Sequence, residues 1–171
     1  MGFTEEQLVA ELPGLLRYAR LLTRDAQGAE DLVQETVVRA LERAAQFRGD
    51  ASVATWLHRI MFTRFVDATR ARLPEPVDEE ALVDAVEADW RDDAYTVTAE
   101  VVLERAERRE ELLDALLRLP VPYRTAIVLH DVEGLTASAV AEVQQVSLSA
   151  AKQRIRRGRE MLVSALAGGA E

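Results

Sequence analysis

Cysteine is absent from this chain of 171 residues. Its absence excludes a disulfide scaffold, a thiolate metal site and a cysteine nucleophile, and it suits a reducing compartment. Apolar runs are also short, since none approaches the roughly 18 residues that a membrane-spanning helix needs. The first residues carry Glu5, Glu6 and Glu11 but no apolar signal region. We therefore expect a cytoplasmic protein that does not enter a membrane.

Motifs for catalysis are missing from the sequence as well. It contains no phosphate-binding loop, no metalloprotease motif and no nucleophile motif. His58 and His130 have no companions at the spacing of metal ligands. We expect neither an enzyme nor a protein that holds a metal or another cofactor.

The chain is rich in apolar and charged residues. Apolar residues make up 49% of it, which is ample for a packed core, and its formal net charge is −9. Residues 73–111 hold fourteen acids and four bases, whereas the segments on either side are close to neutral. Because this middle segment begins with two prolines and scatters its apolar residues among carboxylates, it is typical of an acidic linker.

On both sides of the acidic segment, apolar residues recur at helical spacing. We predict an all-α fold of two small domains, residues 1–72 and 98–171, joined by an acidic linker over 73–97. Thr4 with Gln7 predicts a capping box for the first helix, and we expect Pro13 to interrupt or restart that helix. Asp25 is the expected cap of a second helix that ends at Gln46. The later helices are expected over residues 53–72, 98–118, 122–131, 137–144 and 148–166.

The last two expected helices have the spacing of a helix-turn-helix, because only QQVS separates them and Thr136 and Ser147 stand at N-cap positions. Along the final helix, polar and cationic side chains point away from an apolar stripe. The stripe consists of Leu148, Ala151, Ile155 and Leu162. The predicted duplex-binding residues are Ser149, Lys152, Gln153, Arg154, Arg156 and Arg157. Since salt screens exposed charges beyond about 8 to 10 Å, a distant acidic linker does not cancel this basic helix.

The stretch LRLPVPYRTAIVLHDVEGLTASAVAEVQQVSLSAAKQRIRRGREML resembles the minus-35-reading domain of the extracytoplasmic-function (ECF) group of bacterial sigma factors. The resemblance implies that the last helix enters the major groove of the minus-35 element, with the cations Lys152, Arg154, Arg156 and Arg157 facing DNA. Gln145 stands where the group usually has glycine, and a left-handed conformation there would cost about 1 to 2 kcal/mol. Gly158 is expected to weaken the helix by about 1 kcal/mol relative to alanine.

The N-terminal half carries a second, independent resemblance. The stretches AEDLVQETVVRALERAAQFRG, TWLHRI and VDATRAR resemble the core-binding and minus-10-reading domain of the same group. Helical geometry leaves an acidic face with one apolar member exposed on the helix that follows Ala29. The resemblance implies that this face binds the clamp helices of the polymerase β′ subunit. The predicted polymerase-binding residues are Asp31, Gln34, Glu35 and Val38.

The helix expected over residues 53–72 has two different faces. Its core stripe is predicted to consist of Leu57, Ile60, Met61, Phe65 and Ala68. On the other side apolar groups alternate with arginines, a pattern that suits single-stranded DNA because bases stack on apolar groups while cations hold the backbone. The resemblance implies that this face and the preceding loop bind the melted minus-10 element. The predicted residues are Arg48, Ser52, Thr55, Arg59, Phe62, Thr63 and Arg70. Phe62 is equally compatible with core packing, and Arg64 has no explanation inside the apolar stripe.

The two resemblances together imply a dissociable sigma factor that recognises the minus-10 and minus-35 elements and helps to melt the promoter. Its implied partners are core RNA polymerase, through the β′ clamp helices and the β flap, promoter DNA and an anti-sigma factor. One alternative is a stand-alone helix-turn-helix regulator that binds duplex operators by itself and dimerises through its N-terminal helices. Another is an interaction module, such as an anti-sigma-like decoy, that occupies polymerase without promoter function.

Overall fold

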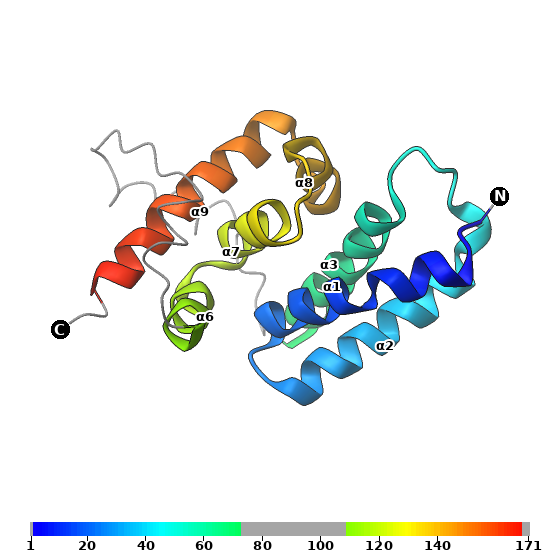
Figure 1. Ribbon diagram of the computed structural model, residues 1–171, viewed down its shortest axis with the longest axis horizontal. Coiled ribbons are helices and arrows are strands. Elements are labelled where there is room, and N and C mark those ends of the chain that lie inside the picture. The colour runs from blue at the N-terminus through cyan, green and yellow to red at the C-terminus, as the bar shows by residue number, and fades with distance from the viewer. Residues whose placement is uncertain (1, 73–108, 169–171) are drawn as a thin grey trace.

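The structure is a computed structural model that describes residues 2–72 and 109–168, and all regular structure in these two ranges is helical (Figure 1). The helices form two clusters, which confirms the predicted all-α fold. The first cluster comprises α1 (Glu5–Thr23), α2 (Ala26–Glu42), a short 3-10 turn (Ala44–Gln46) and α3 (Val53–Arg72). The second comprises α6 (Arg109–Arg118), α7 (Val121–Ile127), a π-helical turn (Val128–Val132), α8 (Ala137–Gln144) and α9 (Leu148–Gly168). The predicted linker over 73–97 and the start of the helix expected from 98 lie outside the described residues.

Side-chain caps determine where the helices of the first cluster begin. The capping box at α1 is confirmed: the Thr4 hydroxyl accepts from the Gln7 backbone N–H at 3.2 Å, and the Gln7 side chain accepts from the Thr4 N–H at 2.8 Å. Asp25 caps α2 by accepting from the Gly28 N–H at 2.6 Å. Both predicted helix starts follow from local sequence, because each cap satisfies a backbone donor that the helix itself leaves unpaired.

Pro13 does not interrupt α1, so that expectation was wrong. The helix continues from Glu5 to Thr23 with Pro13 inside it. A proline in a helix interior costs about 3 kcal/mol, since it lacks the N–H donor and its ring crowds the preceding turn. Apolar side chains on either side of it, among them Leu8, Leu15 and Leu22, are buried along one face of the helix. Burial of this continuous face offsets the local cost of the proline.

Two other helix ends differ from those expected. The second helix ends at Glu42 rather than at Gln46, and the chain continues as a 3-10 turn over Ala44–Gln46. Helix α7 ends at Ile127 and passes into a π-helical turn over Val128–Val132. Turns of the 3-10 type are frequent at helix ends, whereas π-helical turns are rare, and neither is visible in apolar spacing.

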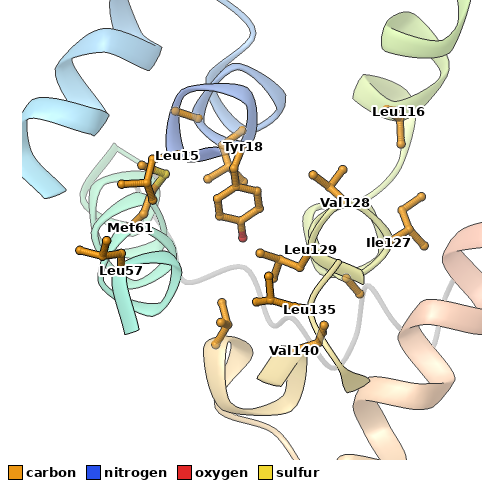
Figure 2. Close-up of a cluster of buried hydrophobic side chains, with 14 of the residues drawn as sticks. Leu15, Tyr18, Leu57, Met61, Leu116, Ile127, Val128, Leu129, Leu135 and Val140 are labelled. Carbon is orange, nitrogen blue, oxygen red and sulfur yellow. The ribbon is translucent and has the colours of Figure 1, made fainter. Parts of the chain in front are cut away.

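A single hydrophobic core runs through both clusters (Figure 2). Tyr18 of α1 is fully buried and points toward Leu129 of the second cluster, while Leu57 and Met61 of α3 line the first cluster's side. Helix α3 packs against α8, and α1 packs against α7 and α6. The two clusters are therefore in direct contact, and a face of each is buried by the other.

A bidentate ion pair reinforces this contact. The Arg17 guanidinium donates to both carboxylate oxygens of Glu133, at 3.0 and 2.8 Å. The Glu133 side chain is only 5% exposed, whereas that of Arg17 is half exposed. Gly14, one helical turn before Arg17, makes room for the carboxylate, because a Cβ there would lie 2.8 Å from Glu133 Oε2. A close approach of this kind explains a glycine in the middle of a helix.

Two arginines also bond across the contact to carbonyl groups at helix ends. Arg24 donates to the Leu117 carbonyl at 2.6 Å, and Arg124 donates to the Leu22 carbonyl at 3.4 Å. Arg124 is buried, and burial, followed by repulsion from Arg24, lowers its pKa to about 10. Its guanidinium still carries a charge at neutral pH, so it favours carbonyl groups at the negative ends of helices as partners.

Gly14→Ala is predicted to change the stability by different amounts in two backgrounds. In the wild-type chain, the added methyl group displaces the Glu133 carboxylate from its bidentate bonds with Arg17, and this loss offsets most of the gain in helix propensity. In a Glu133→Ala background the clash is gone, and the same substitution raises the free energy of unfolding by about 0.5 to 1 kcal/mol through helix propensity. Denaturant unfolding of the four proteins measures both changes, and an equal change in the two backgrounds would contradict the assigned contact.

Candidate nucleic-acid interface

Helices α8 and α9 form the predicted helix-turn-helix. Their N-caps are the expected ones: Thr136 accepts from the Ala139 N–H at 3.2 Å, and Ser147 accepts from the Ala150 N–H at 3.1 Å. Gln145 ends α8 in the left-handed conformation, with φ 56° and ψ 43°. The turn therefore has the geometry that was expected to favour glycine, and a glutamine adopts it at a cost of about 1 to 2 kcal/mol.

The apolar stripe of α9 is confirmed except at its first residue. Ala151, Ile155 and Leu162 are buried, but Leu148 is 43% exposed. Leu148 opens the helix and therefore lies at the rim of the domain, where helical periodicity does not decide burial.

Gly158 is a buried residue of α9 that faces α7. The sequence predicted that it would only weaken the helix, but the structure gives it a packing role. A Cβ there would lie 2.7 Å from the Ile127 side chain and 2.9 Å from the Tyr123 carbonyl oxygen. The glycine therefore allows α7 and α9 to approach closely. Its lower helix propensity is offset by packing that a larger side chain would prevent.

The predicted duplex-binding residues share the outer side of α9, but most of their cations have partners within the protein. Ser149, Lys152, Gln153 and Arg156 are exposed. Arg156 and Arg157 both donate to Glu160, at 3.1 and 3.3 Å, and the Glu160 side chain is only 10% exposed. Arg154 donates to Gln144 Oε1 at 3.2 Å, and Arg159 forms a bidentate pair with Asp131. The basic helix is therefore a set of preorganised cations rather than a row of mobile ones.

Glu160→Gln is predicted to strengthen duplex binding. The substitution removes a carboxylate that neutralises Arg156 and Arg157, so it should raise affinity at low salt and steepen the dependence of log K on log salt by about 1. Glu30→Gln on exposed α2 makes the same change in net charge away from α9 and serves as the control. Fluorescence anisotropy titrations across several salt concentrations measure both slopes. Equal slopes for the two variants would show that α9 does not face the phosphates.

The predicted polymerase-binding residues form one exposed face of α2. Asp31, Gln34, Glu35 and Val38 are all exposed, and Val38 is 54% exposed. Leu41, which the sequence reasoning left out, extends this face with 58% exposure. It stands three residues after Val38 on the same face, and this spacing was the signal that could have found it.

Arg64, which had no explanation in the sequence, bonds to the acidic face of α2. Its guanidinium donates to Glu35 Oε2 at 2.7 Å, and its side chain is about one third exposed. A long arginine side chain can lie over apolar neighbours while its charged end reaches a carboxylate at the surface. Arg64 thus connects α3 to α2, and Glu35 holds it in place.

Two residues of α3 lie on the side opposite to the one expected. Thr55 was predicted to face DNA, but it is buried, and its hydroxyl lies 2.9 Å from that of Ser52. The Ser52 hydroxyl also accepts from the Thr55 N–H at 3.1 Å, so the pair forms the cap of α3. Ala68, expected in the core, is exposed. Local capping explains Thr55, since a residue in the first turn is placed by the cap as well as by the stripe.

The other residues predicted for the minus-10 element lie around α3 and the loop before it. Arg48, Arg59 and Thr63 are exposed, whereas Phe62 is half-buried and packs against the core. Core packing was the alternative interpretation of Phe62, and it explains why the side chain is partly buried. The side chain of Arg70 lies outside the described residues.

A basic cleft of about 380 Å³ opens between α2, α3 and the helix-turn-helix. Its lining residues are Arg39, Arg43, Gln46, Trp56, Arg59, Ile60, Thr63, Arg64, Asp67 and Gln145. Four arginines and one aspartate make its lining positive in a chain of net charge −9. Arg39 and Arg43, which sequence reasoning missed, stand four residues apart on one side of α2, and that spacing was the available signal. Trp56 rests on Phe47, with ring centroids 5.4 Å apart.

The cleft is bounded by both clusters. Gln145, at the turn of the helix-turn-helix, lines it, and Arg59 lies 3.8 Å from Glu142 of α8. The structure therefore brings a residue predicted to bind single-stranded DNA next to the domain predicted to bind duplex DNA. Both partners of this ion pair are exposed to solvent, so it contributes at most about 1 kcal/mol to the contact.

His58 is buried beneath the cleft, at the contact between the clusters. Its Nδ1 lies 2.7 Å from the Ala54 carbonyl oxygen, and its ring lies 5.2 Å from that of Tyr18. Burial lowers the pKa of His58, against weaker opposing effects of the Ala54 carbonyl, Glu133 and Glu11; Arg17 lowers it further. Among residues 2–72 and 109–168, no group of three potential ligands could hold a metal ion. Because burial disfavours its charged form, His58 packs at this contact as a neutral side chain.

The stability of the fold is predicted to fall as the pH decreases below about 6.5. Because the pKa of His58 is lowered on folding, the unfolded chain takes up a proton before the folded chain does. The contribution of His58 to the free energy of unfolding is fully present above the pKa that His58 has in the unfolded chain. As the pH falls below that pKa, the contribution decreases by up to about 1.4 kcal/mol per pH unit. Urea unfolding between pH 7.5 and 5.5 measures this slope, and His58→Phe should reduce it. An unchanged slope in His58→Phe would assign the effect to other groups.

Comparison with known proteins matches both helical clusters. Residues 8–73 match the family described as sigma-70 region 2, and residues 109–162 match sigma-70 region 4. The chain belongs to the ECF group of RNA polymerase sigma factors. The region 2 match covers α1 to α3, and the region 4 match begins with α6 and includes the helix-turn-helix.

Curated relatives are similar over most of their length. RNA polymerase sigma-H factor of Pseudomonas aeruginosa is 33% identical over 146 residues, which cover 83% of this chain and 75% of that protein. The ECF sigma factor SigM of Mycobacterium tuberculosis is 33% identical over 155 residues, covering 89% and 71%. These matches extend across both clusters and the segment between them.

Solved structures show the same fold at lower sequence identity. The sigma factor RpoE of Bartonella quintana, solved in complex with the anti-sigma factor NepR, matches with a TM-score of 0.71 and 23% identity over 95% of this chain and 96% of that one. CnrH, solved in complex with the cytosolic domain of CnrY, matches with a TM-score of 0.64 and 23% identity, covering 97% and 88%. The described part of this chain contains no helix that is both long and apolar enough to cross a membrane.

Proposed function

We propose that this ECF sigma factor associates reversibly with core RNA polymerase in the cytoplasm, directs it to promoters with particular minus-10 and minus-35 elements, and helps to melt the duplex. The observation that carries this proposal is the presence of both sigma-70 regions in one chain, each on its own helical cluster. The region 2 match accounts for the N-terminal helices without a dimerisation role, so a stand-alone regulator is not favoured. In this proposal, the chemistry of RNA synthesis belongs to the polymerase.

The outer side of α9 is proposed to enter the major groove at minus 35. Its exposed Ser149 and Gln153 offer hydrogen-bonding groups for base edges, and Lys152 lies beside them as a point charge for a phosphate. Arg156 and Arg157 are held by Glu160, so they meet DNA in a fixed arrangement. Base edges specify the promoter, whereas the cations set the affinity and the orientation.

The exposed face of α2 is proposed to bind the clamp helices of the polymerase β′ subunit, and the C-terminal cluster to bind the β flap. Val38 and Leu41 supply an apolar centre, and Asp31, Gln34 and Glu35 supply a polar surround. An exposed apolar centre with an acidic rim suits a basic partner helix, since apolar burial gives affinity while charge selects the partner.

The basic cleft beside α3 is proposed to bind the unpaired strand of the minus-10 element. Its arginines attract the backbone, and Trp56 and Ile60 provide apolar surface for bases. Thr63 is one of the lining residues. Thr55 is buried, so we no longer include it in the proposed site. Arg48 and Ser52, in the loop before α3, would contact the strand at its edge.

Promoter binding is proposed to require separation of the two clusters. The two elements are about two duplex turns apart, or roughly 70 Å, whereas the turn of the helix-turn-helix now lines the minus-10 cleft. Fully extended, the 25 residues over 73–97 could span up to about 80 Å, which is sufficient. The predicted linker would thus allow each cluster to reach its own element.

An anti-sigma factor is proposed as a further partner. RpoE of Bartonella quintana was solved in complex with the anti-sigma factor NepR, and CnrH was solved in complex with the cytosolic domain of CnrY. The similarity to these structures covers nearly the whole of this chain, so the surfaces of both clusters are present for a comparable partner.

Transcription with core polymerase tests the proposal. Core enzyme with this chain is expected to start transcription at specific sites in a genomic fragment library, while the free chain binds duplex poorly. Arg59→Ala should reduce promoter opening about tenfold, equivalent to about 1.4 kcal/mol, without reducing core binding. Arg20→Ala, at an exposed position on α1, is the control. Permanganate reactivity of thymines measures opening. Absence of any dependent start site, or tight binding of free chain to a palindromic operator, would contradict the proposal.

A further inference from the structure

Gln144, the last residue of α8, has a buried side-chain amide close to the start of α9. Its Nε2 donates to the Pro122 carbonyl at 2.9 Å and to the Thr125 hydroxyl at 2.6 Å. Its Oε1 accepts from the Arg154 guanidinium of α9 at 3.2 Å. The residue is only 5% exposed, so these contacts form where water does not replace them easily.

The surroundings determine which way the amide points. The Pro122 carbonyl can only accept, so the Gln144 atom facing it must be the nitrogen. The Thr125 hydroxyl donates its own hydrogen to the Val121 carbonyl at 2.7 Å and therefore accepts from the second amide hydrogen. Both hydrogens are used on the α7 side, and Oε1 necessarily faces Arg154. The amide cannot rotate without placing its oxygen against two other oxygens.

Arg154 bonds to a different helix through this amide. Arg156 and Arg157 donate to Glu160 on their own helix, and Arg154 donates across the turn to Gln144 of α8. Its contact therefore connects three elements: α7 through Pro122 and Thr125, α8 through Gln144, and α9 through Arg154. A cation held in this way is placed relative to the body of the domain and not merely relative to its own helix.

We propose that Gln144 is a positioning residue: it fixes the Arg154 guanidinium for a contact with one DNA phosphate and thereby sets the register of α9 in the minus-35 groove. The inference rests on the proposed function, because it assigns a determinant of that same recognition site. A phosphate contact carries no sequence information of its own, but it fixes where the base-reading side chains of the helix stand. Loss of the anchor should therefore blur base selection as well as weaken binding.

Two substitutions at Gln144 separate positioning from structure. Gln144→Met has a similar length but removes all three hydrogen bonds of the amide, among them the bond that connects Arg154 to α8. Gln144→Glu keeps an acceptor for Arg154 but turns an oxygen toward the Pro122 carbonyl. Both variants should lower the thermal midpoint, whereas only Gln144→Met should remove the acceptor that Arg154 finds on α8. Arg154→Ala, alone and with Gln144→Met, completes a double-mutant cycle.

The experiment measures transcription by core polymerase with each variant on a library of promoters randomised at the minus-35 element. The temperature is kept well below the thermal midpoint of every variant. Gln144→Met is expected to reduce discrimination against single mismatches at least threefold, while Gln144→Glu stays within twofold of wild type. Arg154→Ala should match Gln144→Met, and the double variant should lose nothing more. Unchanged discrimination in Gln144→Met, or losses that multiply in the double variant, would overturn the inference alone. A wild-type chain without any dependent start site would overturn it together with the proposed function.

Discussion

The contact between the two helical clusters is the constraint on which the described arrangement depends. Each cluster is small, with few helices, and neither buries its whole apolar surface by itself. Tyr18 lies between them, and the Arg17–Glu133 pair forms beside it with a nearly buried carboxylate. Burial of shared apolar surface holds the clusters together, and the polar bonds at helix ends give the contact one orientation.

Positive charge on this acidic protein acts through local pairing. Glu160 holds two arginines of α9, Asp131 holds Arg159, and Glu35 holds Arg64. Each pair reduces the charge seen from a distance but fixes a guanidinium in space. Since phosphate attraction is short-ranged in physiological salt, a few placed cations matter more to DNA than the net charge of the chain. The basic cleft beside α3 also places cations locally, because arginines of α2, its C-cap and α3 line the same space.

Most of the fold could be predicted from the sequence, because caps and apolar periodicity are local. Thr4, Asp25, Thr136 and Ser147 cap the helices as expected, and α3 and α8 have the expected bounds. The errors occurred where tertiary contacts or the first turn of a helix override periodicity. Pro13 lies inside a helix because the packed face continues past it, and Leu148 is exposed at a rim.

The candidate site was less predictable for the same reason. Arg64 and Gly158 are explained only by partners that are distant in sequence, Glu35 for the first, and Tyr123 and Ile127 for the second. The faces of α2 and α9 followed from helical spacing alone. The cleft, by contrast, required α2, α3 and the turn at Gln145 to meet in space. No sequence pattern encodes such a meeting of separate helices.

The contact between the clusters also has features of an interface that can open. His58 Nε2 and Arg124 Nε are buried there and have no hydrogen-bond partner within residues 2–72 and 109–168. A buried polar atom without a partner costs about 1 to 3 kcal/mol, and exposure to water removes that cost. Separation of the clusters would thus expose apolar surface, which is unfavourable, but would also hydrate these two nitrogens. A permanent core would gain from apolar groups at both positions, whereas a contact that must yield to promoter DNA gains from being only moderately stable.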